Sequence, residues 1–551
     1  MLATTTLGRH TAAMLLRLLL WPFLLPFTLL RYALWRFSKK NEVLRVNLEG
    51  HHAVRAGGSF FERMRPALPR RALRRALRAA VRDRQIRKVQ VAIGHLEGGD
   101  ATVYELRELL REARAGGLEV EAHLAWVDTR TLWLASACSR VHLTPGSLVL
   151  ATGVAAELTF FGEVLGRAGV EVEVIAAGTY KSFMETFTRT GPTEANREAI
   201  DALLDDRFAG LVADLAAGRG LDEAAVRAIF DGGPYTAEEA VALGLADAVT
   251  DPEAFFDEEA LPAWGYQGTP RPWPRWPRRP KLALIEVTGT IRDGSFEDPD
   301  PQGAVPQAVV GCLDAARKSK RIRGVLLHID SPGGSAAASE RMWQAVRKLA
   351  AEKPVVVWMA DVAASGGYYL AAGAQTIVAA PGTLTGSIGV IMARPVIAGL
   401  LARLGLHRVR FERGAHSGLL SPSRPLQEAE RSALERHIQA AYQMFLDRVT
   451  TGRGRDDAWL RPIAEGRVWT GRQALAHGLV DQLGTEADAL SLLAQKVGLD
   501  PQVREVRLIR ARRSLLGRLR PLVVGPRIEA LEVLRLAEEA PVLAWCPVRL
   551  Q

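Results

Sequence analysis

Residues 322–334 read IRGVLLHIDSPGG, an apolar run that ends in a glycine-rich turn. An earlier stretch, residues 86–99, reads IRKVQVAIGHLEGG, and the two stretches begin 236 positions apart (322 − 86). A short apolar run that is rich in Val, Leu and Ile and bounded by Gly and Pro is typical of a buried strand. The two stretches therefore predict two equivalent strands, and they indicate an internal duplication.

The same offset recurs along the chain. Residues matched at this offset are Leu134-Ala135 with Leu370-Ala371, Pro145-Gly146 with Pro381-Gly382, and Gly178 with Gly414. Two later stretches, TAEEAVALGLADAV from Thr236 and TGRQALAHGLVDQLG from Thr470, are similar at an offset of 234 (470 − 236). Chance similarity does not keep one register over such a length. We therefore predict two homologous halves, residues 46–265 and residues 281–500.

Within each half, short apolar strands alternate with helical patterns. In the second half the predicted strands are residues 325–329, 355–358 and 376–379, and a helical pattern at residues 336–350 separates the first two. This alternation predicts an α/β fold with mostly parallel sheets in two tandem domains. In such folds, catalytic groups gather at the carboxyl ends of the strands.

Three segments fall outside the two halves. Residues 1–45 contain an apolar stretch at 14–30, near the lower length limit for a membrane span, and no small-residue cleavage site follows it. We therefore expect a retained N-terminal membrane anchor with a basic flank. Residues 266–280 contain RPWPRWPRRP, whose prolines favour an extended linker. Residues 501–551 form a tail without recognisable chemistry.

The charge and composition restrict the function classes. The chain of 551 residues is 48% hydrophobic and 24% charged, which is typical of globular proteins. Its net charge is +10, but residues 62–88 alone hold eleven Lys and Arg against two acidic residues, a local excess of +9 (11 − 2). This stretch is either a site for anionic lipid headgroups or the solvated face of a helix. No nucleic-acid-binding motif accompanies it, so we expect no nucleic acid as a partner.

The cysteines indicate neither a metal site nor a disulfide framework. Cys138, Cys312 and Cys546 are widely spaced and form no CxxC pair. The cysteines therefore predict no zinc site. We also expect that the chemistry of this chain needs no metal and no cofactor.

Two glycine-rich turns in the second half carry the candidate chemistry. They are residues 330–335 (DSPGGS) and residues 363–368 (AASGGY), and each follows a predicted strand and opens a helix. The free N–H groups at a helix start suit a developing oxyanion, and glycine lets a substrate approach closely. Ser365 at the start of the second helix is a candidate nucleophile, or else an ordinary helix cap.

A serine nucleophile needs a base, and two candidates stand out. His416, in the glycine-bounded segment RGAHSG, is the only histidine with suggestive surroundings. Lys181 lies in an apolar and small-residue stretch, GTYKSF, in a chain that prefers arginine. A lysine serves as a base only where burial lowers its pKa enough to leave a neutral amine.

Long motifs of the chain resemble signal peptide peptidase A, also called protease IV, a serine peptidase family with the Clp protease/crotonase fold. The motifs are DSPGGSAAASE, ADVAASGGYYLAAGAQTIVAAPGTLTGSIGV, GRVWTGRQALAHGLVDQLG and, in the first half, GTYKSFMETFTR. The resemblance covers residues 86–490 and extends to the long, duplicated form of the family. It implies that Lys181 is the base, that Ser365 is the nucleophile, and that the N–H groups of Gly333 and Gly366 form the oxyanion hole.

The duplication offers an independent reason for a site divided between the halves. The family's short form carries its lysine in a segment like GAHSGLLSPSRP, where this chain has Ser417, and the first-half position equivalent to Ser417 is Lys181 (417 − 236). The position equivalent to Ser365 is Thr129 (365 − 236). Each half has therefore kept one member of a Ser–Lys dyad. The resemblance also implies that Ser387 orients the lysine, whereas a turn serine is the simpler interpretation.

The expected function is hydrolysis of cleaved signal peptides and other hydrophobic peptides through an acyl-enzyme. The resemblance implies a homo-oligomer, namely a tetramer, at the bacterial inner membrane. It also implies that the catalytic part of the chain lies in the periplasm. The basic residues that follow the apolar stretch instead favour the cytoplasmic side. Two alternatives remain open: a crotonase-like enzyme acting on an acyl-CoA, and a membrane scaffold or pseudopeptidase.

Overall fold

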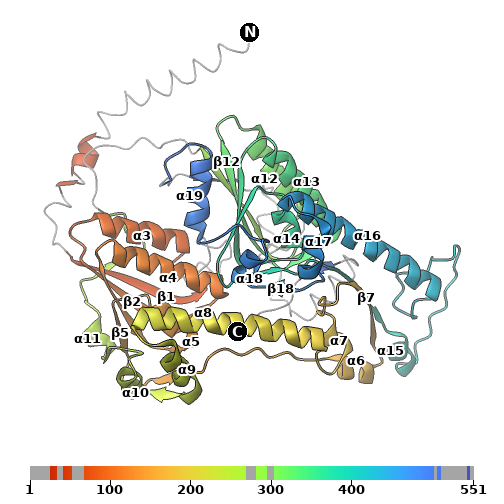
Figure 1. Ribbon diagram of the computed structural model, residues 1–551, viewed down its shortest axis with the longest axis horizontal. Helices are drawn as coiled ribbons and strands as arrows, with labels where there is room; N and C mark the ends of the chain where they lie inside the picture. Colours follow the sequence, from red (N-terminus) through yellow and green to blue (C-terminus); the bar gives the residue numbers. More distant parts are fainter. Residues whose placement is uncertain are drawn as a thin grey trace, which may run out of the picture. The chain divides into compact units, whose positions relative to one another are not determined.

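The structure is a computed structural model that describes residues 25–30, 32–33, 41–51, 68–268, 281–294, 303–501, 506–509 and 543–545 (Figure 1). The chain divides into two compact units, each assembled from several segments. Unit 1 comprises Met1–Gly98, Glu105–Gly153 and Leu211–Arg279, and unit 2 comprises Gly99–Tyr104, Val154–Gly210 and Pro280–Gln551. Unit 2 therefore contains a piece of the predicted first half, and this piece carries Lys181.

Unit 1 is built around a parallel sheet. In its described part the strand order is β10-β1-β2-β3-β5-β9. The strands are β1 (Val43–His51), β2 (Lys88–Glu97), β3 (Glu119–Leu124), β5 (Arg140–Leu143), β9 (Ala248–Val249) and β10 (Leu261–Pro262). Alternating apolar residues such as Val89, Val91 and Ile93 of β2 are buried in the core.

Helices and a second, small sheet complete unit 1. Helices α3 (Arg70–Arg82) and α4 (Asp100–Ala115) run side by side along the parallel sheet (Figure 1). The other elements are β4 (Val127–Asp128), α5 (Thr129–Ala135), β6 (Leu148–Leu150), α9 (Glu223–Gly232), β8 (Tyr235–Thr236), α10 (Ala237–Ala242) and α11 (Pro252–Phe255). Helix α8 (Glu194–Arg219) contributes residues to both units.

The basic stretch 62–88 is in part a structural feature of α3. Arg70 and Arg74 form ion pairs with Glu105 at 2.9 and 3.1 Å, and the Glu105 side chain is buried. Two of the positive charges therefore help to dock α3 on α4. The first six residues of the stretch lie outside the described residues.

Unit 2 holds a larger, mostly parallel sheet. The order of its main path is β18-β16-β14-β12-β11-β20, and β15 and β19 extend the sheet from β14. The strands are β11 (Leu282–Thr288), β12 (Gly324–Ser331), β14 (Val355–Ala364), β15 (Thr376–Ala379), β16 (Leu384–Gly386), β18 (Val468–Trp469), β19 (Gln482–Leu483) and β20 (Val506–Leu508). Only the pairing of β16 with β18 is antiparallel among these described strands.

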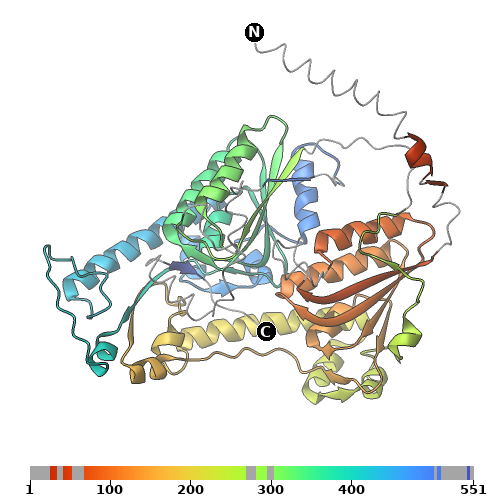
Figure 2. The ribbon, with the colours of Figure 1, turned by 180° about the vertical axis from the view of Figure 1, so that it is seen from behind.

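Helices cover both faces of this sheet. Helices α12 (Pro306–Lys318) and α13 (Ala336–Ala350) pack on one face, and α19 (Glu486–Lys496) packs on the other (Figures 1 and 2). The remaining helices are α14 (Gly366–Ala371), α16 (Glu428–Arg453), α17 (Asp457–Leu460), the 3-10 helix η1 (Arg461–Ile463) and α18 (Gly471–Ala476). The two helical layers bury the sheet on both sides, which is why its central strands β12 and β14 are mostly apolar.

A separate antiparallel sheet in unit 2 joins segments from distant parts of the chain. Its order is β13-β21-β17-β7, with β13 (Gly333–Ser335), β21 (Leu543–Trp545), β17 (Val390–Val396) and β7 (Glu171–Ala177). Strand β7 pairs with β17 along its whole length, from Glu171 opposite Val396 to Ala177 opposite Val390. Short helices flank it: α6 (Gly162–Ala168), α7 (Glu185–Thr188) and α15 (Ala398–Arg403). A strand of the first half thus belongs to a sheet of the second.

The internal duplication is visible in both parallel sheets. The order β1-β2-β3-β5-β9 in unit 1 is equivalent to β11-β12-β14-β15-β19 in unit 2. The ion pair of Arg219 with Asp247 recurs as that of Arg453 with Asp481. The prediction of an α/β protein with mostly parallel sheets is therefore confirmed.

The predicted membrane anchor lies almost entirely outside the described residues. Of the apolar stretch 14–30, the structure describes only residues 25–30, which are helical. Within the described ranges, no helix combines the length and the apolar character that crossing a bilayer requires.

Candidate active site

Ser365 occupies a strained turn between β14 and α14. Its backbone has φ 54° and ψ −115°, a left-handed conformation that costs a non-glycine residue about 1–3 kcal/mol. The Ser365 N–H donates to the carbonyl of Gly386 at 2.8 Å, and the Ser365 carbonyl accepts the N–H of Tyr369 at 2.8 Å. The surrounding fold therefore holds this serine in a conformation that it would not adopt by itself, which is typical of functional residues.

Lys181 reaches Ser365 from the segment that follows β7. Its side chain is buried, with the residue 5% exposed. The Nζ atom lies 2.8 Å from Oγ of Ser365, 2.9 Å from Oγ of Ser387 and 3.0 Å from the carbonyl oxygen of Ser387. These three neighbours are neutral oxygen atoms. The structure thus brings Lys181 beside Ser365 and Ser387, which lie 184 and 206 residues away in the sequence.

The turn that carries Ser387 is also strained. Ser387 has φ 51°, and its N–H donates to the carbonyl of Arg467 at 2.7 Å. This hydrogen bond and the backbone conformation help to position the residue whose carbonyl oxygen and Oγ contact the lysine. Nζ is therefore in contact with two atoms of Ser387 in addition to Oγ of Ser365.

The turn Glu465-Gly466 supports the lysine segment, and sequence reasoning missed it. The carbonyl of Glu465 accepts the N–H of Tyr180 at 2.7 Å, and its carboxylate accepts the N–H of Thr179 at 3.0 Å. Gly466 packs directly against the backbone of Lys181. Gly466 is the first residue of the motif GRVWTG, and this was the only sequence signal, because the contacts of the turn lie about 285 residues away in the chain (465 − 180 = 285).

Tyr442 holds the Glu465 carboxylate from the other side. Its hydroxyl donates to Oε1 of Glu465 at 3.1 Å. Burial, together with the charge of Glu465, raises the pKa of Tyr442 to about 12, so the phenol stays protonated and keeps donating at neutral pH. Glu465 itself has φ 53°, a third left-handed non-glycine residue close to the lysine.

The two predicted oxyanion glycines lie side by side. An ideal Cβ atom on Gly366 would lie 3.3 Å from Cα of Gly333, so the two turns are in van der Waals contact. Gly366 is the first residue of α14, and its N–H therefore has no acceptor within the helix. The N–H of Gly333 donates to Oγ of Ser331 at 3.2 Å, a bond that a substrate oxygen would have to share or replace.

The other candidate residues lie apart from this group. His416 is exposed in the segment between α15 and α16, so Lys181 is the predicted base that the structure places beside Ser365. Ser417 is exposed in the same segment. In unit 1, Thr129 begins α5, and its hydroxyl donates to the carbonyl of Leu150, the residue equivalent to Gly386 (386 − 236).

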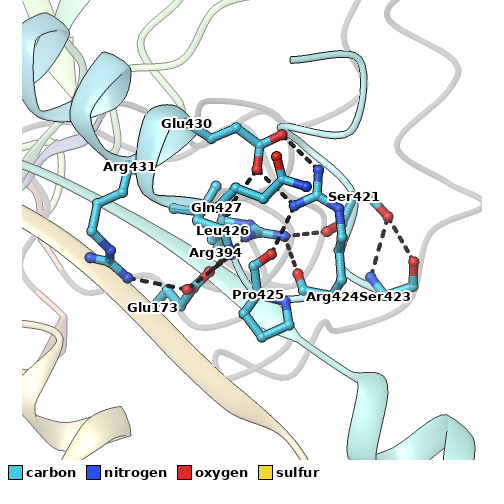
Figure 3. Close-up of polar contacts among 10 residues, drawn as sticks. All are labelled: Glu173, Arg394, Ser421, Ser423, Arg424, Pro425, Leu426, Gln427, Glu430 and Arg431. Carbon is cyan, nitrogen blue, oxygen red and sulfur yellow. Dashed lines mark hydrogen bonds and ion pairs between the residues drawn. The ribbon is translucent and has the colours of Figure 1, made fainter. Parts of the chain in front are cut away.

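Glu173 anchors β7 and, through it, the lysine segment. Figure 3 shows its carboxylate accepting hydrogen bonds from Arg394 at 2.6 Å, from Arg431 at 3.1 Å and from the N–H of Leu426 at 3.2 Å. Arg394 also donates to the carbonyl of Arg424 at 2.9 Å. Burial lowers the pKa of Arg394, and the Glu173 carboxylate opposes that shift, so the carboxylate stabilises the buried charge.

Replacing Glu173 with glutamine should destabilise the sheet that carries the lysine. Arg394 would lose its charged partner in a largely buried position, which costs about 3 kcal/mol. Hydrogen exchange of the β7 amides measures this loss as faster local opening. The control is Glu163→Gln, which removes an exposed pair with Arg167 and should cost only about 0.3 kcal/mol. Equal exchange of β7 in both variants would contradict the assigned role of Glu173.

Chemically, the arrangement can activate a hydroxyl and stabilise a negative oxygen. An amine within hydrogen-bond distance of a serine can accept its proton, and a free helix N-terminus beside it can bind an oxyanion. These are the requirements of acyl transfer through a serine ester.

Comparisons with known proteins agree with this chemistry. The family model described as Peptidase family S49 matches residues 124–261 and 347–500. The chain is 30% identical over 512 residues to "Serine protease SPPA, chloroplastic" of Arabidopsis thaliana, covering 90% of this chain and 75% of that protein. It is 30% identical over 441 residues to "Protease 4" of Salmonella typhi, covering 76% and 71% respectively. It is 36% identical over 248 residues to "Putative protease slr0021" of Synechocystis sp., covering 45% and 86%.

Proposed function

Because the chain belongs to peptidase family S49 and is a serine protease, we propose that it cleaves peptide bonds with Ser365 as nucleophile and Lys181 as general base. The single observation that carries this assignment is the 2.8 Å contact between Nζ of Lys181 and Oγ of Ser365 in a buried site. The matched relatives are named proteases, which favours peptide hydrolysis over the acyl-CoA alternative.

The proposed reaction proceeds in two halves. The neutral amine of Lys181 takes the hydroxyl proton of Ser365 while Oγ attacks the carbonyl carbon of the substrate. The N–H groups of Gly366 and Gly333 stabilise the resulting oxyanion. The lysine then gives its proton to the leaving amine, and an acyl-enzyme remains on Ser365. Water, activated by the same amine, hydrolyses this ester.

Burial of the lysine supports its role as a base. Removing an ammonium group from water disfavours its charged form, and the atoms in contact with Nζ given above are neutral oxygens. Ser387 accepts hydrogen bonds from the amine of Lys181. These bonds leave the lone pair of the lysine nitrogen for the hydroxyl of Ser365. Ser387 is therefore an orienting residue in this proposal.

An extended peptide is the substrate form that fits the site. Strand β21 pairs antiparallel with β13, with Gly333 opposite Trp545, so a backbone strand is accommodated beside the Gly333 turn. Because Ile291 bonds to the other edge of β13, a substrate strand would take the place of β21. It would then gain main-chain hydrogen bonds and lie next to the proposed oxyanion donors. We expect cleaved signal peptides and other hydrophobic peptides, because an apolar chain tolerates this buried environment.

We also propose a location and an assembly for the protein. It is a homo-oligomer held at the bacterial inner membrane by its N-terminal anchor, and its catalytic part lies in the periplasm. Protease accessibility in spheroplasts tests the side of the membrane: digestion of the catalytic units by external protease supports the periplasm, and protection contradicts it.

Acylation by a probe tests the assignment of the nucleophile. A peptide β-lactone that esterifies serine hydroxyls should add its mass to the tryptic peptide that contains Ser365. Labelling should disappear in Ser365→Ala and fall to background in Lys181→Met, because the hydroxyl then lacks a base. Labelling of another serine in the wild-type protein, or full labelling in Lys181→Met, would refute the proposed dyad.

A further inference from the structure

Helix α3 of unit 1 and helix α12 of unit 2 are equivalent in the duplication, but they differ in charge. Their bounds, Arg70–Arg82 and Pro306–Lys318, are related by the repeat offset of 236 (306 − 70 and 318 − 82). Helix α3 holds six arginines and no acidic residue, whereas α12 holds Asp314, Arg317 and Lys318, a net charge of +1 (2 − 1). The fold therefore accepts this helix without an excess of arginine, and the charge of α3 needs a separate explanation.

Two of the six arginines dock α3, and the other four form one stripe. Arg70 and Arg74 pair with the buried Glu105, as described above. The other four are spaced by four, three and four residues, which places them on one face of the helix. All four are exposed or half-buried, and they are Arg71, Arg75, Arg78 and Arg82. We call these four residues the arginine stripe.

The charges of the arginine stripe are poorly compensated. Arg78 forms an ion pair with Glu112 at 3.2 Å, and the two side chains are 41% and 42% exposed. Among the described residues, Arg75 and Arg82 have no carboxylate partner. At the positions of the stripe, α12 carries Gln307, Gly311, Asp314 and Lys318, a net charge of zero (1 − 1). A solvated helix face normally mixes both signs of charge, so a stripe of one sign indicates an anionic partner.

The arginine stripe ends where the N-terminal segment enters unit 1. Strand β2 follows α3, and its first residue, Lys88, pairs with Val43 at the start of β1. The N–H of Arg87 donates to the carbonyl of Glu42 at 2.9 Å. Thirteen residues (43 − 30) connect the apolar stretch 14–30 to β1, a length of chain that spans at most about 45 Å. A bilayer that holds the apolar stretch is therefore within reach of the end of α3.

An exposed tryptophan lies beside the same end of α3. The N–H of Ala263 donates to the carbonyl of Arg45 at 2.8 Å, and the hydroxyl of Tyr266 donates to Asp83, the residue that follows α3, at 2.8 Å. Trp264 lies between these two contacts in the chain and is 56% exposed. Tryptophan prefers the boundary between lipid and water, where its ring meets acyl chains and its N–H meets headgroups. This edge of unit 1 thus combines positive charge with an interfacial aromatic ring.

We propose that the arginine stripe of α3, together with Trp264, binds the anionic headgroups of a phospholipid bilayer. From Arg71 to Arg82 the stripe covers about 17 Å, at 1.5 Å for each of 11 residues (82 − 71), so it contacts several headgroups at once. Guanidinium groups donate pairs of hydrogen bonds to phosphate oxygens. The contact goes beyond the proposed peptidase activity, and it orients unit 1 at a membrane to which the N-terminal stretch alone would only tether it. The tether in this argument rests on the N-terminal anchor proposed above.

Fluorescence quenching in the full-length chain tests this contact. We would attach a bimane label to an Arg84→Cys variant, beside the stripe, in which Cys546 is replaced by serine. Cys138 and Cys312 are buried and stay in place. The protein is reconstituted in phosphatidylcholine vesicles, with or without phosphatidylglycerol, that carry a nitroxide-labelled lipid as quencher. The label should be quenched at least about threefold more with phosphatidylglycerol than without it, and high salt should remove the difference, because salt screens the charges.

Variants of α3 and α12 separate the stripe from net charge. Replacing Arg75, Arg78 and Arg82 with glutamine should lower the equilibrium constant of the contact about 100-fold, at about fivefold for each arginine, and should abolish the effect of phosphatidylglycerol. Lysine at the same three positions should keep the effect, because the charge remains. The matched control removes three exposed charges at the end of the equivalent helix α12 and should change nothing: Lys318→Gln, Lys320→Gln and Arg321→Gln.

The outcomes that would overturn the proposal are distinct. They are full quenching in the glutamine variant of α3, an equal loss in the control variant of α12, or binding of RNA by the stripe while phosphatidylglycerol leaves the label unquenched. If the N-terminal stretch does not hold the chain in phosphatidylcholine vesicles, flotation with phosphatidylglycerol vesicles compares the same variants. None of these readouts needs catalysis, so a failed dyad and a failed lipid contact are distinguishable.

Discussion

Replacing Lys181 with methionine should lower kcat/KM for peptide hydrolysis by about 10⁴-fold while the protein stays folded. Methionine keeps the length and the buried, apolar stem of the side chain but removes the amine that contacts Ser365 and Ser387. Without a base the hydroxyl of Ser365 attacks only as the protonated alcohol. Steady-state kinetics on a hydrophobic peptide measure the effect, and thermal unfolding verifies the fold.

The combination with Ser365→Ala distinguishes a dyad from two separate contributions. Residues that act as one unit lose activity in a non-additive manner, so the double variant should be no slower than either single variant. A Lys181→Met enzyme that retains a tenth of its activity would show that another group supplies the base.

Replacing Gly466 with alanine should lower kcat about 100-fold with a smaller change in KM, because a small misplacement of a catalytic group has effects of this size. An ideal Cβ atom at Gly466 would lie 2.7 Å from the backbone nitrogen of Lys181, a distance that real Cβ atoms do not adopt. Gly466 also has φ 79°, which disfavours any side chain. The lysine segment would have to shift, and Nζ would leave its position beside Ser365.

Gly478→Ala is the matched control. Gly478 has φ 75°, nearly the same backbone conformation, but the nearest atom to its ideal Cβ is 3.8 Å away. This variant carries the conformational strain without the collision, so it should lose stability and keep its activity per folded molecule. Equal losses of kcat in the two variants would mean that strain alone explains the effect of Gly466→Ala.

Much of the fold could be predicted because it depends on local patterns. Apolar runs such as residues 325–329 alternate with helical periodicity, and this order of elements suffices to predict a parallel α/β sheet. The repeat then predicted a second sheet of the same kind, which unit 1 contains. The pairing of β7 with β17 could not be predicted, since nothing in either strand specifies a partner more than 200 residues away (390 − 177 = 213).

The candidate site was predictable to a different degree for each residue. Ser365 follows from a glycine-rich turn after a strand, and Lys181 follows from the repeat and the family resemblance. Their catalytic roles stay proposals until the variants are measured, although the structure places Nζ and Oγ 2.8 Å apart. The support from Glu465 had no local signal, because an acidic residue in a turn is ordinary until Thr179 is found to donate to it.

The sequence by itself determined the repeat, the strands and helices of each half, and the family. It did so because strand and helix periodicity and glycine turns are properties of short segments, and because a repeat preserves its register. Only the tertiary structure decided that a strand of the first half joins a sheet of the second, and that Glu465-Gly466 supports the lysine. Strand partners, left-handed backbone conformations and burial depend on contacts between residues hundreds of positions apart, and a linear pattern does not contain them.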